Sequence, residues 1–135
     1  MAHTARQQRG QRSEQLAVCF LRSAGYQIKE TNVRFPVGEI DIVAREGNTL
    51  CFVEVRATSS SQWGGPLASI DARKRHRLLQ AARWYLARLR QLPLEIRFDV
   101  VAITWDTPDR PSVELIQAAF TNDDGWTSGR GRRWM

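Results

Sequence analysis

Residues 38–56 read GEIDIVAREGNTLCFVEVR, and this stretch decides the fold. Two runs rich in β-branched and apolar residues, 39–45 and 49–57, stand on either side of a Glu-Gly-Asn tripeptide. A Gly-Asn sequence between two such runs is typical of a tight β-turn. We therefore predict an antiparallel hairpin whose two loop residues are Gly47 and Asn48.

The predicted turn also fixes which side chains face each other, because pairing then continues residue by residue away from the loop. Asp41 is expected opposite Glu54 on one side of the hairpin. On the same side, Glu39 is expected opposite Arg56. The other side carries only apolar residues and is expected to pack into the core. Those residues are Ile40, Ile42, Ala44, Cys51, Val53 and Val55.

Two carboxylates placed directly opposite each other, as expected for Asp41 and Glu54, have Cβ atoms about 4.5–5.5 Å apart and repel each other. A hard divalent cation such as Mg²⁺ relieves this repulsion, because it usually binds one or two carboxylates together with water and substrate phosphate. The alternative is that the two side chains share a proton or point into solvent. Spacing alone favours neither interpretation.

A third carboxylate, Glu14, is expected in a helix near this pair. Apolar side chains recur at helical spacing over residues 13–24, and Gly25 follows as a stop signal. Glu14 lies on the same helix face as Ala17 and Leu21, which turns it toward the sheet. The alternative is an acidic residue that is favoured in a first helical turn by the helix dipole alone.

The remaining pattern predicts an α/β domain with the order α, β, β, β, α, β and a last element that is a strand or a short helix. We expect residues 1–12 to be a flexible arm, residues 13–120 a single domain and residues 121–135 a basic tail. Outside the hairpin, the expected elements are strands at 26–34 and 95–105, a polar loop at 58–68, a helix from about Ile70 to Gln91, and the uncertain element at 113–120.

The composition limits the possible functions. The chain has 135 residues, a formal net charge of +6 and 42% hydrophobic residues, which suffices to fill one core. Its positive charge, carried by 18 Arg and 2 Lys, points first to polyanionic partners. The longest apolar run, at 16–21, is far short of the ~20 residues that span a bilayer. We therefore expect a cytoplasmic protein without a membrane partner.

The second predicted helix begins with a basic cluster formed by Arg73, Lys74, Arg75 and Arg77. Four cations in five positions can contact several backbone phosphates, and such binding weakens steeply with salt. A cationic helix start also opposes the helix dipole, which favours a role beyond solubility. The alternative is an ordinary solvated helix face.

Two motifs of the hairpin, Gly38-Glu39-Ile40-Asp41 and Phe52-Val53-Glu54-Val55-Arg56, resemble those of the PD-(D/E)XK nuclease superfamily. More closely, the chain resembles the YraN family of uncharacterised bacterial proteins, which is restriction-endonuclease-like in fold and similar in pattern to archaeal Holliday-junction resolvases. The resemblance runs from about Arg9 to Phe120. Besides the hairpin and the basic helix start, it rests on Gly10, Glu14, Gly25-Tyr26, Asn32, Arg34 and Arg97-Phe98-Asp99-Val100-Val101.

The resemblance implies a restriction-endonuclease-like three-layer fold, with a central mixed β-sheet, a hairpin core and flanking helices. It implies that Asp41 and Glu54 hold Mg²⁺ or Mn²⁺ with the Val55 carbonyl. Glu14 would support the ion directly or through water. The implied activity is hydrolysis of nucleic acid, with structured DNA as the expected substrate and a homodimer as a compatible state. Gln80 could reach this site, as a glutamine does in some nucleases of the superfamily.

Arg56 stands where the superfamily has lysine. Lysine is a compact point charge that can position the attacking water, whereas arginine is planar, always protonated and bidentate toward phosphate. Arg56 can therefore clamp substrate or stabilise the transition state, but it cannot accept a proton. The alternative is a cross-strand ion pair with Glu39.

Three functional classes follow from these observations. The first is a nucleic-acid-binding protein of nuclease-like fold that acts as a metal-dependent endonuclease. The second is a noncatalytic nucleic-acid-binding or assembly protein that keeps the fold with Arg56 in place of lysine. The third is a protein-interaction scaffold whose charge serves solubility.

Overall fold

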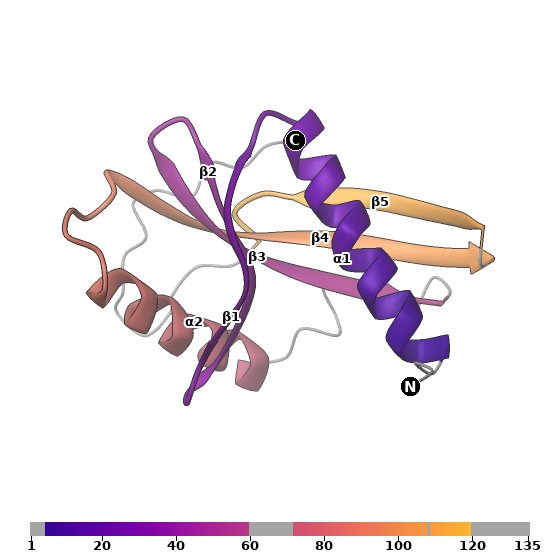
Figure 1. Ribbon diagram of the computed structural model, residues 1–135, viewed down its shortest axis with the longest axis horizontal. Coiled ribbons are helices and arrows are strands. Elements are labelled where there is room, and N and C mark those ends of the chain that lie inside the picture. Colours follow the sequence, from indigo (N-terminus) through magenta and orange to yellow (C-terminus); the bar gives the residue numbers. More distant parts are fainter. Residues whose placement is uncertain (1–4, 60–71, 108, 120–135) are drawn as a thin grey trace.

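The computed structural model describes residues 5–59, 72–107 and 109–119, which form two helices and five strands (Figure 1). One mixed sheet holds the strands in the order β1-β2-β3-β4-β5. Only β3 and β4 are parallel neighbours within these ranges, and the other neighbours are antiparallel. The predicted α/β class and central hairpin are confirmed. The elements are α1 Ala5–Ser23, β1 Gln27–Phe35, β2 Gly38–Glu46, β3 Thr49–Thr58, α2 Ala72–Ala87, β4 Glu95–Thr107 and β5 Arg110–Ile116.

The sheet lies between the two helices, and each face is covered by one of them (Figure 1). Because side chains alternate along a strand, neighbouring residues of β3 enter different cores. The α2 cluster contains Val33, Ile40, Val43, Leu50, Phe52, Leu78, Leu79, Ala81, Ala82, Tyr85 and Phe98. The α1 cluster contains Ala17, Leu21, Tyr26, Ile42, Ala44, Cys51, Val53, Val101, Ile103 and Trp105.

Helix α1 begins at Ala5, whereas the apolar periodicity predicted a start at residue 13. The additional turns are polar, so the hydrophobic pattern could not reveal them. They are nevertheless fixed to the sheet near Trp105, whose Nε1 donates a hydrogen bond of 2.8 Å to Ser13 Oγ. The Arg12 guanidinium lies 4.6 Å from the centroid of the Trp105 ring. The part of the expected arm from residue 5 onward is therefore helical.

The structure also corrects the predicted end of the second helix and settles the type of the last element. Helix α2 ends at Ala87, four residues before the predicted Gln91, because the next amides bond three residues back, as Arg88 N–H does to the Tyr85 carbonyl at 3.1 Å. The uncertain last element is a strand, β5, antiparallel to β4. The predicted helix start at Ile70, most of the predicted loop and the basic tail lie outside the described residues.

Strand β1 is irregular along its length. Its register against β2 shifts by one residue between Ile28 and Glu30, which marks a β-bulge at Lys29. Asn32, further along the same strand, has a φ of 53°, and asparagine tolerates this left-handed conformation better than most residues.

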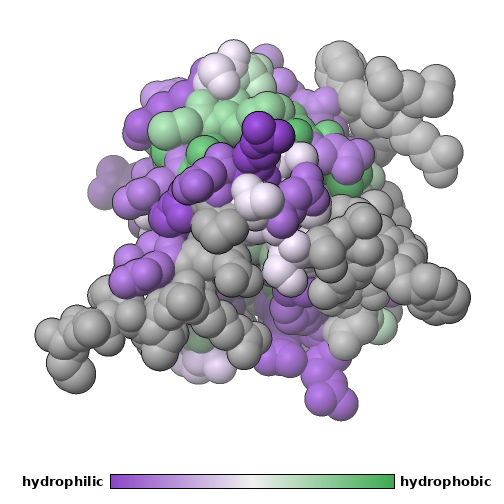
Figure 2. All heavy atoms as spheres, turned by 90° about the vertical axis from the view of Figure 1, so that its right-hand side faces the viewer, coloured by the Kyte–Doolittle hydropathy of each residue, from purple (hydrophilic) through white to green (hydrophobic). Residues whose placement is uncertain are grey.

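Within the described ranges, neither helix is long and apolar enough to cross a membrane. Figure 2 views the molecule from the right-hand side of Figure 1. In that view, hydrophilic residues occupy most of the described surface, around one hydrophobic patch near its upper edge.

Candidate functional site

The hairpin has the predicted register, but its ladder is shorter than expected. Pairing runs from Glu46 opposite Thr49 as far as Ile42 opposite Val53, and there it ends. Asp41 and Glu54 therefore lie one position beyond the last pair, where β2 and β3 separate. The Val55 N–H, which the ladder would otherwise satisfy, instead donates a 2.9 Å hydrogen bond to Asp41 Oδ2. The Asp41 carboxylate thus occupies the opening between the strands.

The separation of the strands corrects two predictions. The ladder ends before it reaches Glu39, so Glu39 and Arg56 do not face each other in it as predicted. Glu39 lies opposite Arg34 of β1, and Arg34 Nε approaches Glu39 Oε1 to 3.7 Å. Ile40, predicted on the side of Ile42, packs in the α2 cluster. The regular alternation of side chains between the two faces of β2 is therefore interrupted at Asp41.

Burial and mutual repulsion control the protonation of the Asp41–Glu54 pair. Loss of solvent and the nearby Glu54 charge raise the pKa of Asp41 to about 8, against the effect of the Val55 hydrogen bond. Burial also raises the pKa of Glu54, while Lys74, Arg56 and a hydrogen bond with Asp41 oppose that rise. Without a cation, the pair is therefore best accommodated when it holds one proton between the two carboxylates.

The donor set of this pair fits a small hard cation. Two carboxylates are the number that Mg²⁺ usually takes from a protein, with waters and substrate completing its shell. The Val55 carbonyl faces the same opening as Asp41, because the N–H and C=O of one strand residue point to the same side. In the described part of the chain, no three His, Cys, Asp or Glu side chains gather closely enough to hold a metal. Glu14 acts at longer range, as a further charge that raises the pKa of Asp41.

Helix α2 approaches the pair because β2 begins with glycine. A Cβ at Gly38 would lie 2.8 Å from the carbonyl oxygen of Arg77, a distance that real Cβ atoms do not tolerate. Any other residue at this position would push apart the start of β2 and the first turns of α2. Gly38 stands three residues before Asp41, so this contact places the basic helix start close to the carboxylates.

Gly38→Ala should lower the free energy of unfolding by about 1–3 kcal/mol, because the added methyl overpacks the contact with the Arg77 carbonyl. Chemical denaturation measures the difference. Gly10→Ala is the matched control: Gly10 lies in α1 with no atom within 4 Å of its would-be Cβ, and the change should stabilise the protein by about 0.5–1 kcal/mol. Equal effects of the two substitutions would contradict the close approach.

The other predicted binding residues line different faces of α2. Arg73, Arg75 and Arg77 are exposed, as is Lys74. Gln80 is half-buried and follows Arg73 by seven residues, so it shares the helix face of Arg73. Lys74 is near enough to Glu54 for its charge to oppose the rise in the pKa of that carboxyl, whereas Gln80 lies on a separate face of the helix.

Comparison with known proteins identifies relatives of this chain. Residues 13–103 match the uncharacterised protein family UPF0102. The chain belongs to the UPF0102 family. A UPF0102 protein of Moorella thermoacetica is 46% identical over 116 residues, which cover 85% of this chain and 97% of the relative. A UPF0102 protein of Desulfosudis oleivorans is 45% identical over 115 residues, covering 85% and 91%. The predicted resemblance to the YraN family is thereby confirmed at the level of the family.

The UPF0102 chain also contains a buried ionic network at the hairpin-turn end of the sheet. Arg97 and Asp99 of β4 form a bidentate pair, with Nε to Oδ1 at 2.8 Å and Nη2 to Oδ2 at 2.9 Å. Arg97 Nη2 also donates to Glu46 Oε1 at 2.9 Å. Asp99 further accepts hydrogen bonds from the Tyr26 hydroxyl and the Ala118 N–H, each at 2.9 Å. The network therefore links β4 to β2, to the residue before β1 and to the residues after β5.

No role for this network was predicted, although both Arg97 and Asp99 contribute to the family resemblance. The available signal is their spacing: they are two residues apart and alternate with the apolar residues Ile96, Phe98 and Val100, so they share one face of the strand. Arg97 is 8% exposed and Asp99 is 0% exposed, a depth at which charges need partners. Burial and the neighbouring Asp99 raise the pKa of Tyr26, which keeps its hydroxyl neutral as a donor. We assign the network a structural role.

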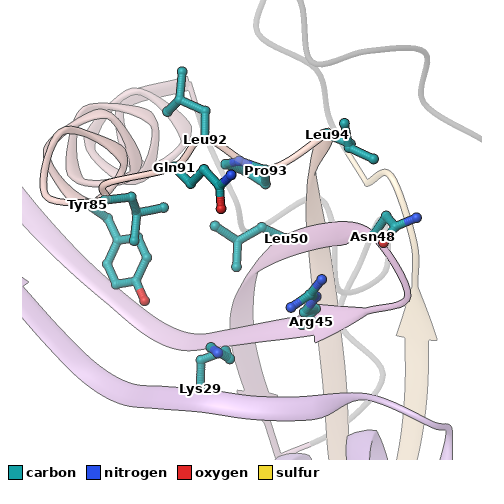
Figure 3. Close-up of a pocket in the computed structure, with 10 residues that line it drawn as sticks. Lys29, Arg45, Asn48, Leu50, Tyr85, Gln91, Leu92, Pro93 and Leu94 are labelled. Carbon is teal, nitrogen blue, oxygen red and sulfur yellow. The ribbon is translucent and has the colours of Figure 1, made fainter.

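A pocket of about 390 Å³ lies near the hairpin loop and the end of α2 (Figure 3). Lys29 and Arg45 supply its charged side chains, and leucines line much of the remainder. Figure 3 shows Leu50 between these cations and the residues that follow α2. Neither carboxylate of the Asp41–Glu54 pair lines it. The pocket is therefore distinct from the candidate site.

Proposed function

We propose that this UPF0102 protein is a divalent-metal-dependent phosphodiesterase that cleaves nucleic acid, with structured DNA as its substrate class. The observation that carries the proposal is the Asp41–Glu54 pair, two half-buried carboxylates that lie where β2 and β3 separate. The element order and the two hairpin motifs support a restriction-endonuclease-like fold for the domain.

In this proposal, Asp41, Glu54 and the Val55 carbonyl would hold the cation, and Glu14 would support it directly or through water. A bound Mg²⁺ or Mn²⁺ supplies Lewis-acid polarisation and a more acidic water. Hydrolysis adds water across one P–O bond: the water oxygen bonds to phosphorus, the bond to the leaving sugar oxygen breaks, and a water proton ends on that oxygen.

The cations around the pair bind the substrate. Arg56 has the planar geometry that clamps two phosphate oxygens. Arg73, Arg75 and Arg77 on the exposed faces of α2 neutralise neighbouring phosphates, so binding should weaken with salt. These contacts recognise the backbone and not the base sequence.

Arg56 also favours a second function, noncatalytic binding of structured nucleic acid. A site without the hairpin lysine can retain phosphate binding while it loses the group that positions water. The two functions share their surface and differ in whether a phosphodiester bond is broken.

Mg²⁺ or Mn²⁺ should raise the melting temperature of the wild type by several degrees, because only the folded chain presents the two carboxylates together. The shift should be much smaller in Asp41→Asn and Glu54→Gln. Glu114→Gln, a change at an exposed position of β5, is the matched control and should respond like the wild type. Differential scanning fluorimetry over a metal titration measures these shifts. Equal shifts in all four proteins would refute the metal site.

Cleavage is tested with branched, flapped and single-stranded DNA under the same metal conditions. The wild type should cleave at least one branched substrate, and Asp41→Asn should lose about a hundredfold or more of that rate. Salt-sensitive binding of these substrates without cleavage by the wild type would support the noncatalytic function instead. Absence of both binding and cleavage would overturn both proposals.

A further inference from the structure

We infer that α2 binds an unpaired nucleic-acid strand beside the candidate site, with one base stacked on Trp84 and backbone phosphates held by Arg73 and Arg77. This inference rests on the proposed function and narrows its substrate class. The substrate is structured DNA in which a single-stranded segment adjoins the cleaved bond, as in a flap or a fork, and not a continuous duplex.

Four residues form a continuous stripe along α2. They recur at spacings of four, three and four residues, so their side chains share one face of the helix. None of them belongs to the buried side of α2, and all but the half-buried Gln80 are exposed. An extended ligand can therefore contact the whole stripe at once. This basic stripe consists of Arg73, Arg77, Gln80 and Trp84.

Trp84 is the feature that points to a ligand with flat rings. It is 46% exposed and is the only exposed aromatic side chain in the described ranges, although tryptophan is highly buried on average. Phe35 of β1 supports its ring, with the two ring centroids 5.8 Å apart. The Arg88 guanidinium lies 5.3 Å from the Phe35 centroid and forms an ion pair with Glu30 of β1. The Trp84 ring is thus held against the sheet while part of it stays open to solvent.

The basic stripe passes the candidate site at Arg77. A Cβ at Gly38 would lie 3.4 Å from the Arg77 Cβ, so this side chain leaves α2 next to the start of β2. Gly38 precedes Asp41 by three residues, a rise of about 10 Å along an extended strand. Trp84 follows Arg77 by seven residues, again about 10 Å along the helix axis. A short single strand can therefore reach from the carboxylates past Arg77 to Trp84.

The chemistry of the stripe matches the two parts of a nucleotide. Among the described residues, neither Arg73 nor Arg77 forms an ion pair with a carboxylate, and guanidinium groups bind phosphate oxygens strongly. An aromatic ring stacks on the flat face of any base. In a duplex those faces are covered by the neighbouring base pairs, so only an unpaired base offers one to Trp84. The stripe therefore favours a single strand over a duplex or an acidic protein surface.

The first test compares an oligothymidylate of about twelve nucleotides with an abasic oligomer of the same length, by fluorescence anisotropy with a chelator present. The wild type should bind the oligothymidylate about tenfold more tightly, because a stacked base adds to the phosphate contacts. Trp84→Ala should lose this preference and keep its affinity for the abasic oligomer, whereas Trp84→Phe should retain most of it. Leu92→Ala, which removes another exposed apolar side chain, is the matched control and should behave like the wild type.

The phosphate contacts are tested by the salt dependence of the same binding. Arg77→Gln should weaken binding of both oligomers and lower the slope of log affinity against log salt by about 0.7. Arg22→Gln, in the last turn of α1 on the other face of the sheet, should leave the slope unchanged. Equal base preference in the wild type and Trp84→Ala would overturn the inference. So would an effect of Trp84→Ala on self-association alone, measured by sedimentation, because it would assign Trp84 to a protein interface.

Cleavage separates this inference from the proposed function. With Mn²⁺, the wild type should cleave flapped DNA at least about tenfold faster than a continuous duplex of the same sequence, and Trp84→Ala should lose most of this preference. An active wild type with equal rates on both substrates would overturn the inference and leave the proposed function standing. An inert wild type with a base preference that depends on Trp84 would reject the proposed cleavage and support strand binding by α2.

Discussion

Arg97→Met should lower the free energy of unfolding by about 3–5 kcal/mol, measured by urea denaturation at neutral pH. The substitution fills similar space but leaves the fully buried Asp99 without the guanidinium that binds both its oxygens. The Tyr26 hydroxyl and the Ala118 N–H still donate hydrogen bonds to Asp99, but these donors are neutral and cannot balance its charge. The cost is therefore that of an uncompensated buried carboxylate.

Arg34→Met provides the matched control for this prediction. Arg34 also pairs with a carboxylate, Glu39, but at 3.7 Å and with 79% of its own side chain exposed. Such surface pairs contribute less than about 1 kcal/mol. The double variant Arg97→Met, Asp99→Asn should lose less free energy of unfolding than the two single variants lose together. Each single change leaves one buried charge without its partner, whereas the double change removes both charges. Similar losses in Arg97→Met and Arg34→Met would contradict the importance of the network.

Without divalent cations, the free energy of unfolding should fall as the pH rises from about 4 to about 8. The pKa of Asp41 rises from 3.8, the ordinary value for an aspartate in water, to about 8 in the folded protein. Between these values the folded state holds a proton that the unfolded chain has released, so raising the pH favours unfolding. Each unit of difference corresponds to about 1.36 kcal/mol, and the total effect should reach several kcal/mol.

The contribution of Asp41 is isolated by Asp41→Asn, which cannot ionise and should lose most of this slope. Asp109→Asn, at an exposed position before β5, should keep the slope of the wild type. Urea denaturation at half-unit pH intervals, with a chelator present, measures all three proteins. A wild-type slope that persists in Asp41→Asn would assign the pH dependence to other groups.

The hairpin could be predicted from its sequence because local chemistry determines it. A Gly-Asn turn and two apolar runs specify the register, which holds from Glu46–Thr49 to Ile42–Val53. The meeting of Asp41 and Glu54 follows from that register. The end of the ladder does not, because separation of β2 and β3 depends on how the whole sheet twists.

The contribution of α2 to the site is a tertiary effect. The sequence showed a basic helix start, but not how near this start lies to the hairpin carboxylates. That separation depends on where α2 crosses β2, and the close contact between Gly38 and the Arg77 carbonyl fixes this crossing. The buried ionic network is tertiary for the same reason, since Tyr26 and Ala118 are distant in sequence from β4 and meet its charged pair only in the folded sheet.

The irregularity of β1 affects how this protein meets copies of itself. β1 is an outer strand, and a regular strand in that position can add a strand from another molecule and start aggregation. The bulge at Lys29 and the left-handed Asn32 break the row of backbone groups that such addition needs. The outer edge of β1 is therefore a poor template for adding a strand from a second copy of the chain.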